Sequence, residues 1–397
     1  MEDKYWINED EDFNYGNTGE ENTSQYSDDY INEKYKRGEI RIITEQARYP
    51  LDNIKPMLAS GKYDRNPEYQ RRKRWDNIRK SRLIESFIMN VPIPPIFLYE
   101  VEYSFFEVMD GLQRLTAIDD FYKDSFPLEG LQYWKELNGK IYSNLPSQIK
   151  AGIDRRYLSS IVLLQETAKT KEEAEFLKQM VFERLNSGGE LLTPQETRNA
   201  LYNGKFNRLC IELAKKDNFR EMWQLPLESA GETALLESIP YRKMEDVELV
   251  LRFFAYRHIK QLKSPIDKFL DEYLKHANNL TDDSLKKLGS VFNETIDLIY
   301  TVLGKYAFFL PGTWNDENKS PKKTIYDPMM QAFSRILNKK DILIEKKESI
   351  VNDLYQNKTL LNRQKEKNPY IFDGRYNNRK DVQDRVEYFE NFLNQYI

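Results

Sequence analysis

The segment Val108-Met109-Asp110-Gly111-Leu112-Gln113-Arg114 contains the change from strand to helix that decides the predicted fold of this chain. Residues 96–100 and 104–109 are rich in aromatic and aliphatic side chains, which predicts two short strands joined by a tight connection. Residues 114–122 carry apolar side chains at helical spacing. The chain is therefore expected to run from strand through turn to helix at Asp110 and Gly111.

This turn has the composition of an anion-binding site. Amide groups at the N-terminus of a helix are unpaired, and the helix dipole adds partial positive charge there. Gly111 would let the backbone approach a phosphate closely. Arg114 could donate to phosphate oxygens, and Asp110 could hold Mg²⁺, which prefers carboxylate and phosphate oxygens. On spacing alone, a plain turn in which Asp110 caps the helix is the simpler interpretation.

The sequence around this turn predicts an α+β fold. A strand is expected at 39–49, a helix at 51–60, a second helix at 75–90 that ends at the proline-rich segment 91–95, and another strand at 158–165. Later in the chain the spacing is almost entirely helical, with amphipathic segments at 171–186, 193–203, 244–260, 283–303, 325–337 and 381–394. A small mixed α/β domain at 33–170 and a mainly helical domain at 171–397 follow from this pattern.

The first part of the chain, residues 1–32, differs in composition from the rest. Residues 1–30 contain ten acidic side chains and one lysine, a net charge of −9, which leaves +5 on the remainder of a chain whose net charge is −4. Few aliphatic side chains accompany these acids, so a disordered tail is predicted. A solubilising role is the favoured interpretation, and competition with nucleic acid for the basic body is the alternative.

Composition excludes several classes of protein. The sequence has no apolar stretch long enough to cross a bilayer and no apolar segment typical of a secretory signal, so a cytoplasmic protein without a membrane partner is expected. The single cysteine, Cys210, excludes an internal disulfide, and two histidines, His258 and His276, argue against a histidine-rich metal site. No Gly-Lys pair is followed by Ser or Thr, so the chain lacks a Walker A loop.

Two groups of motifs extend outward from the turn. The first consists of Tyr69-Gln70-Arg71, Trp75, Leu83-Ile84-Glu85-Ser86, Pro92-Ile93-Pro94-Pro95 and Asp110-Gly111-Leu112-Gln113-Arg114-Leu115-Thr116. The second consists of Phe182-Glu183-Arg184-Leu185-Asn186-Ser187-Gly188-Gly189 and Leu192-Thr193-Pro194-Gln195-Glu196-Thr197-Arg198-Asn199-Ala200. In this order they resemble the GmrS-type domain, the N-terminal half of GmrSD-like modification-dependent restriction enzymes, which is related to ParB and sulfiredoxin. The resemblance covers about residues 35–205, and the chain looks like a stand-alone member without the HNH nuclease domain.

The resemblance implies a ParB-like nucleotide pocket at residues 33–170 that the helical domain completes. By resemblance, the catalytic residues are Asp110, Gln113 and Arg114, with Asp110 also the ligand of Mg²⁺. The implied nucleotide and phosphate ligands are Gln70, Arg71, Gly111, Asn186, Gly188, Gly189 and Arg198. The family usually has Gln where this chain has Leu112. If Leu112 packs inward nothing is lost, whereas a lost water-positioning role would slow turnover.

The second group of motifs also has a purely structural interpretation. Gly188 and Gly189 follow a predicted helix and are typical of its C-terminal cap, while Thr193 and Glu196 form the capping box of the next helix. Both interpretations can hold together, because a helix end and a helix start facing one cleft would present amides to an anion. Glu196 is accordingly predicted to be a cap rather than a general base.

The resulting hypothesis is nucleoside triphosphate binding and Mg²⁺-dependent hydrolysis in a prokaryotic defence or DNA-transaction system. The basic residues Arg72, Lys73 and Arg74 are candidates for nucleic-acid contact, with Trp75 expected to stack on a base or to join the core. One alternative is a ParB-like nuclease or nickase, and another is a non-catalytic module in which nucleotide switches DNA or protein binding. DNA, a separate effector or nuclease, and further copies of the chain are the partners that this hypothesis admits.

Overall fold

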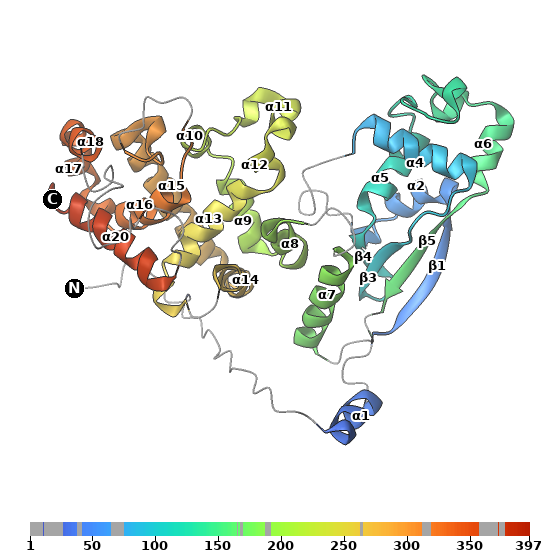
Figure 1. Cartoon of the computed structure of the whole chain (residues 1–397), viewed down its shortest axis with the longest axis horizontal. Coiled ribbons are helices and arrows are strands. Elements are labelled where there is room, and N and C mark those ends of the chain that lie inside the picture. The colour runs from blue at the N-terminus through green and yellow to red at the C-terminus, as the bar shows by residue number, and fades with distance from the viewer. Residues whose placement is uncertain are drawn as a thin grey trace. The chain divides into compact units, whose positions relative to one another are not determined.

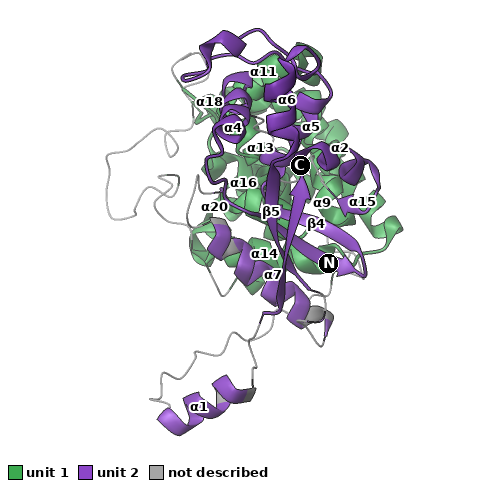
Figure 2. Cartoon of the chain, turned by 90° about the vertical axis from the view of Figure 1, so that its right-hand side faces the viewer, with its two compact units in different colours: residues 1–18, 193–397 green, residues 19–192 purple. Residues whose placement is uncertain are grey.

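The computed structural model describes residues 11, 27–37, 42–64, 75–164, 166, 170–186, 192–262, 265–311, 319–356, 372 and 378–397. The chain divides into two compact units, one formed by Gly19–Leu192 and the other by Met1–Thr18 together with Thr193–Ile397 (Figure 2). The first contains the sheet and the second is helical (Figure 1). The predicted α+β fold, with strands in the N-terminal half and helices after them, is confirmed.

A five-stranded mixed sheet forms the centre of the first unit. The strands are β1 (Thr44–Pro50), β2 (Tyr63–Asp64), β3 (Ile96–Glu102), β4 (Phe105–Asp110) and β5 (Tyr157–Leu163), in the order β1-β5-β3-β4-β2. The β1–β5 and β3–β4 pairs are antiparallel, whereas β3–β5 and β2–β4 are parallel. β3 and β4 therefore occupy the interior of the sheet, and the turn after β4 leaves from a strand with neighbours on both sides.

Helices enclose the core of this unit. They are α2 (Leu51–Ala59), α4 (Asn77–Met89), α5 (Leu112–Tyr122), α6 (Ser147–Asp154) and α7 (Lys171–Asn186), whereas the described side chains of α1 (Asp28–Arg37) are exposed. Figure 1 shows α2, α4 and α5 side by side next to the sheet, and α5 contacts both of the others. Leu115, Ile118 and Phe121 on α5 are fully buried in the apolar core. The helix that begins at the turn is thus fixed by its own apolar face.

A buried carboxylate ties α4 to the following loop. Glu85 accepts hydrogen bonds from the backbone amides of Gln132, Tyr133 and Trp134 at 3.2, 2.7 and 2.9 Å. Burial alone would raise the pKa of Glu85, but these three amides outweigh it and lower the pKa below its ordinary value. Glu85 belongs to the motif that carries the family resemblance, and its contacts here are structural.

The second unit is a helical bundle with one large apolar core. Its helices are α8 (Pro194–Leu201), α9 (Lys205–Leu213), α10 (Asp217–Met222), α11 (Gly231–Glu237), α12 (Ile239–Arg242), α13 (Glu245–Tyr256), α14 (Ile266–Ala277), α15 (Asp282–Leu303), α16 (Lys323–Ser334), α17 (Lys340–Glu345), α18 (Lys347–Tyr355) and α20 (Arg379–Leu393). Phe253, Phe254 and Phe292 meet edge to face or tilted at its centre, with ring centroids 5.0–6.1 Å apart. None of the helices in the described ranges combines the length and the apolar character that a bilayer crossing demands.

The boundary between the units differs from the predicted one. It lies between Leu192 and Thr193 rather than after residue 170, so α7 belongs with the sheet. The physical reason is the packing of α7 on β4, where Lys178 Nζ lies 2.6 Å from Glu107 Oε2. Helical periodicity alone could not reveal which unit the helix joins.

The predicted disordered tail also differs from the structure at two places. The helix α1 begins at Asp28, inside the predicted tail, with acidic residues in its first turn where they favour helix formation. Glu11 is buried in the helical unit. Except for Glu11 and residues from 27 onward, the predicted tail lies outside the described residues.

Candidate functional site

The candidate site is the turn between β4 and α5. β4 ends at Asp110, which lies opposite Phe97 of β3, and Gly111 leaves the strand with a φ of 94° in the left-handed region. α5 begins directly at Leu112, and no side chain caps its N-terminus with a hydrogen bond. The first amides of α5 lack intrahelical acceptors because of helix geometry. The predicted strand–turn–helix is therefore present, with an uncapped helix start.

Gly111 is required for packing as well as for backbone conformation. A Cβ atom at this position would lie 2.3 Å from Cγ2 and 2.9 Å from Cβ of Ile96. Ile96 is fully buried at the start of β3 and cannot move without disturbing the sheet. The backbone at Gly111 thus lies closer to Ile96 than a residue with a Cβ atom would allow.

Replacing Gly111 with alanine is expected to destabilise the first unit by about 2–3 kcal/mol, the sum of left-handed strain and overpacking. Gly139→Ala is the matched control, since Gly139 has a φ of 81° but nothing within 4 Å of an added Cβ. Gly139→Ala should lower the free energy of unfolding by only about 1 kcal/mol, the cost of backbone strain alone. Urea unfolding of both variants measures the difference, and equal losses would show that the approach to Ile96 is unimportant.

Arg114 fastens the turn to the proline-rich segment that precedes β3. Its Nη1 donates to the carbonyl oxygens of Pro94 and of Pro95, the latter at 3.1 Å. Its Nη2 lies 2.5 Å from Oδ2 of Asp110. The Arg114 side chain is only 12% exposed, whereas that of Asp110 is 45% exposed. Asp110 thus offers a solvent-accessible carboxylate beside a guanidinium that is held in place.

The other two side chains of the turn have distinct surroundings. Leu112 is 8% exposed and belongs to the apolar core of the unit. It packs inward, so the departure from the family's usual Gln costs the turn no packing. Oε1 of Gln113 accepts a hydrogen bond from the Trp75 amide at 3.1 Å. The Trp75 ring packs against the core, with the Arg79 guanidinium 4.7 Å from its centre.

Residues 54–203 match the family model described as GmrSD restriction endonuclease, N-terminal domain. This part of the chain is similar to the GmrSD N-terminal domain. The match contains the whole turn, the proline-rich segment that Arg114 contacts, and α8 at the start of the helical unit. Searches of curated proteins and of solved structures found no match.

Several of the predicted site residues lie outside the part of the chain that the structure describes. Gln70, Arg71, Arg72, Lys73, Arg74, Gly188 and Gly189 lie outside the described residues. Asn186 is the last residue of α7, and only its backbone is described. Their predicted roles toward nucleotide or nucleic acid stay predictions.

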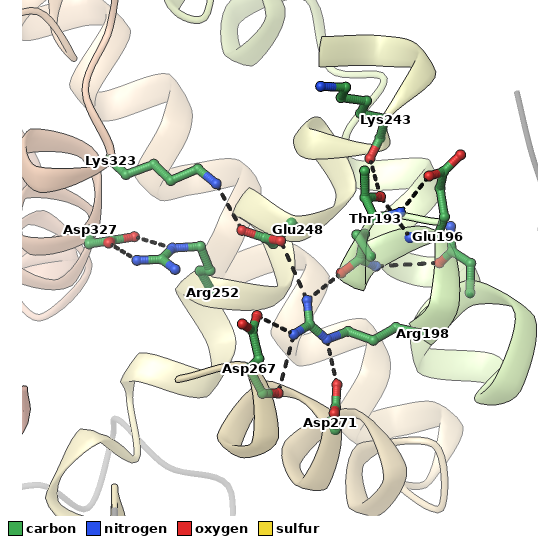
Figure 3. A network of polar contacts seen from close by, with 12 residues as sticks. Thr193, Glu196, Arg198, Lys243, Glu248, Arg252, Asp267, Asp271, Lys323 and Asp327 are labelled. Carbon is green, nitrogen blue, oxygen red and sulfur yellow. Dashed lines mark hydrogen bonds and ion pairs between the residues drawn. The ribbon is translucent and has the colours of Figure 1, made fainter. Parts of the chain in front are cut away.

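Arg198 lies in the helical unit, in α8, and its guanidinium is surrounded by carboxylates (Figure 3). Nε lies 2.6 Å from Asp271 Oδ1, and Nη2 lies 2.8 Å from Asp267 Oδ1. Nη1 contacts Glu248 at 3.4 Å and Gln195 at 3.3 Å. These contacts join α8 to α13 and α14, a structural role that sequence reasoning missed. Its assignment as a phosphate ligand stays a prediction.

The capping box at the start of α8 is confirmed. Thr193 Oγ1 accepts from the Glu196 amide at 3.3 Å, and Glu196 Oε2 accepts from the Thr193 amide at 2.7 Å. Thr193 also donates from its hydroxyl to the carbonyl oxygen of Lys243 at 3.1 Å, which ties the helix start to the residues before α13. Glu196 is thus a cap, as its spacing predicts.

Asp110 provides a single carboxylate toward the predicted Mg²⁺. Among the ranges that the structure describes, no three His, Cys, Asp or Glu side chains are grouped to hold a metal ion. Mg²⁺ is commonly bound through one or two carboxylates while water and substrate phosphates supply its other ligands. The exposed Asp110 fits that mode of binding.

Proposed function

We propose that this chain binds a nucleoside triphosphate at the Asp110–Arg114 turn and hydrolyses it with Mg²⁺ in a restriction-like defence system. The observation that carries the proposal is the uncapped start of α5 beside an immobilised Arg114, within a segment similar to the GmrSD N-terminal domain. Free amides and a fixed guanidinium are the donors that phosphate oxygens need.

The residues of the turn would share the work of phosphoryl transfer. Such a reaction depends mostly on positioning and on stabilising charge, and needs little covalent chemistry from the protein. The amides of the first turn of α5 and Arg114 would hold phosphate oxygens, while the accessible Asp110 would hold Mg²⁺. The metal would neutralise charge on the phosphates. Because Asp110 also pairs with Arg114, nucleotide binding and the position of the guanidinium are coupled.

Phosphate release from ATP, GTP, CTP and UTP with Mg²⁺, with and without DNA, tests the proposal. Asp110→Asn is the decisive variant, because it keeps an acceptor for Arg114 and removes the charge that a metal requires. We expect its nucleotide affinity to fall by roughly 10- to 100-fold, the worth of a charged contact. Asp52→Asn is the matched control, since Asp52 is an exposed carboxylate in the first turn of α2.

Arg114 requires a gentler substitution than alanine. Its contacts with Pro94 and Pro95 hold the turn, so Arg114→Ala would alter structure and ligand binding together. Arg114→Lys retains the charge and removes the fork. Thermal unfolding measured beside nucleotide binding separates the two effects. Wild-type nucleotide affinity in both Asp110→Asn and Arg114→Lys would refute the assignment.

A non-catalytic nucleotide switch is the second candidate, favoured by the engaged state of Arg114. Its donors already contact Pro94, Pro95 and Asp110. Arg114 would have to give up some of these contacts before it could stabilise the charge of a transition state. Binding at one nucleotide per chain without multiple turnover would support the switch. Nicking of a plasmid with Mg²⁺ or Mn²⁺ in the absence of nucleotide turnover would instead support a nuclease.

A further inference from the structure

Glu11 occupies a fully enclosed position in the helical unit. Its side chain is fully buried and lies among Arg257, His258 and Tyr273. These partners are more than two hundred residues away along the chain, with separations of 246, 247 and 262. A contact between such distant residues is a property of the fold and not of local sequence.

The contacts are those of a carboxylate-binding site. Nη1 of Arg257 donates to Oε1 of Glu11 at 3.2 Å, and Nη2 lies 3.1 Å from Oε2, so the guanidinium addresses both oxygens. The Tyr273 hydroxyl donates to Oε1 at 3.1 Å, and His258 Nε2 lies 3.4 Å from the same oxygen. Paired contacts of this kind match the planar geometry of a carboxylate.

The site is formed by rigid parts of the bundle. Arg257 is the C-terminal cap of α13, His258 follows it, and Tyr273 is on α14. The rings of His258 and Tyr273 lie 5.4 Å apart, and the side chains of Arg257 and His258 are almost completely buried. A buried guanidinium needs a partner, because an arginine cannot lose its charge inside a protein.

We propose that Arg257, His258 and Tyr273 form a carboxylate socket whose ligand is Glu11, and that this contact anchors the acidic N-terminal segment on the helical unit. The segment Glu9-Asp10-Glu11-Asp12 is wholly acidic. Acidic character attracts it to the basic socket, and the bidentate contact selects one carboxylate.

The proposed socket predicts that replacing Glu11 lowers the stability of the helical unit and that added free carboxylate restores it. In the full-length chain, Glu11→Ala should lower the folding equilibrium constant of the helical unit roughly a hundredfold, because it removes the carboxylate that contacts the buried Arg257 guanidinium through both oxygens. Acetate should refill the space and restore stability, with about a tenfold gain when its concentration is ten times its dissociation constant. Thermal unfolding in acetate, against sodium chloride at equal ionic strength, measures both effects.

Two further variants make the result decisive. Glu2→Gln removes an acidic charge near the N-terminus, outside the segment Glu9-Asp10-Glu11-Asp12, and should leave stability unchanged. In Arg257→Met the socket loses its cation, so adding Glu11→Ala to it should cost much less than Glu11→Ala alone. If Glu11→Ala is too unstable to purify, its refolding yield with and without acetate gives the same comparison. Equal acetate effects in wild type and Glu11→Ala, or additive losses in the double variant, would overturn the proposal.

Discussion

Asp327→Ala is expected to destabilise the helical unit by about 3–5 kcal/mol, the cost of leaving a buried charge without its partner. Asp327 Oδ1 accepts from Arg252 Nε at 3.1 Å, and Oδ2 accepts from Nη2 of the same guanidinium. The two side chains are 6% and 10% exposed. Nη2 of Arg252 also donates to the Tyr256 hydroxyl at 2.7 Å. Water has little access to replace the lost carboxylate.

Arg252 cannot escape the loss by releasing its proton. Burial alone would lower the pKa of Arg252, but Asp327, Tyr256 and Glu248 together outweigh it and raise the pKa above its ordinary value. Even without Asp327 the guanidinium would stay charged at neutral pH. The variant must therefore either bury an unpaired cation or open the contact between α13 and α16 to water.

Urea unfolding measures this effect, with Asp341→Ala as the matched control. Asp341 is an exposed carboxylate in the first turn of α17, and its loss should change stability by less than about 0.5 kcal/mol. The double variant Arg252→Met with Asp327→Leu should recover much of the loss, because apolar side chains can replace a buried ion pair. Equal losses in Asp327→Ala and Asp341→Ala would contradict the argument.

The secondary structure near the turn could be predicted because its causes are local. The expected helix at 75–90 corresponds to α4 at Asn77–Met89, and the expected strand at 104–109 corresponds to β4 at Phe105–Asp110. Apolar spacing, proline and glycine act within a few residues of the chain. Ile266–Ala277, the helix α14, was not among the predicted helices although one of its faces is buried. Its length does not explain the omission, because α13 and α16 also have 12 residues and were predicted.

The contacts of the site could be predicted only in part. Asp110 and Arg114 are only four residues apart in the sequence. The turn that brings Asp110, Gly111 and Arg114 together could therefore be predicted. The acceptors of Arg114 at Pro94 and Pro95, and the bond from Trp75 to Gln113, depend on tertiary packing and left no pattern. The family resemblance marked these residues without giving their contacts.

Arg198 shows most clearly that tertiary contacts could not be predicted from the sequence. Its replacement is the second change for which we expect a large effect on stability. Arg198→Met should destabilise the helical unit by about 3–4 kcal/mol, at the lower end of the cost of breaking a buried ion pair. We place the cost at the lower end because Asp267 and Asp271 are partly exposed, so water can solvate them once the cation is gone. Arg208→Met is the control, because Arg208 is exposed on α9, and its effect should be below about 0.5 kcal/mol.

The pH dependence of stability gives an independent measure of the Arg198 contacts. Burial alone would raise the pKa of Glu248, but Lys323, Arg252 and Arg198 outweigh it and lower the pKa below its ordinary value of 4.5. Glu248 therefore contributes stability that is fully present above that value and is lost as the pH falls through its lower, folded-state pKa. Removing Arg198 should reduce the loss of stability on acidification below about pH 5.

Arg198→Lys then separates the structural role of this residue from the phosphate contact that the family resemblance implies. Lysine keeps the charge but cannot form ion pairs with Asp267, Asp271 and Glu248 at the same time. We therefore expect a folded but less stable protein. If Arg198 acts only through these carboxylates, the folded Arg198→Lys protein should bind nucleotide with wild-type affinity well below its unfolding temperature. A fall in affinity without further loss of stability would instead identify Arg198 as a ligand. Calorimetric titration beside thermal unfolding distinguishes the two, because only a ligand contact changes affinity in a protein that is already folded.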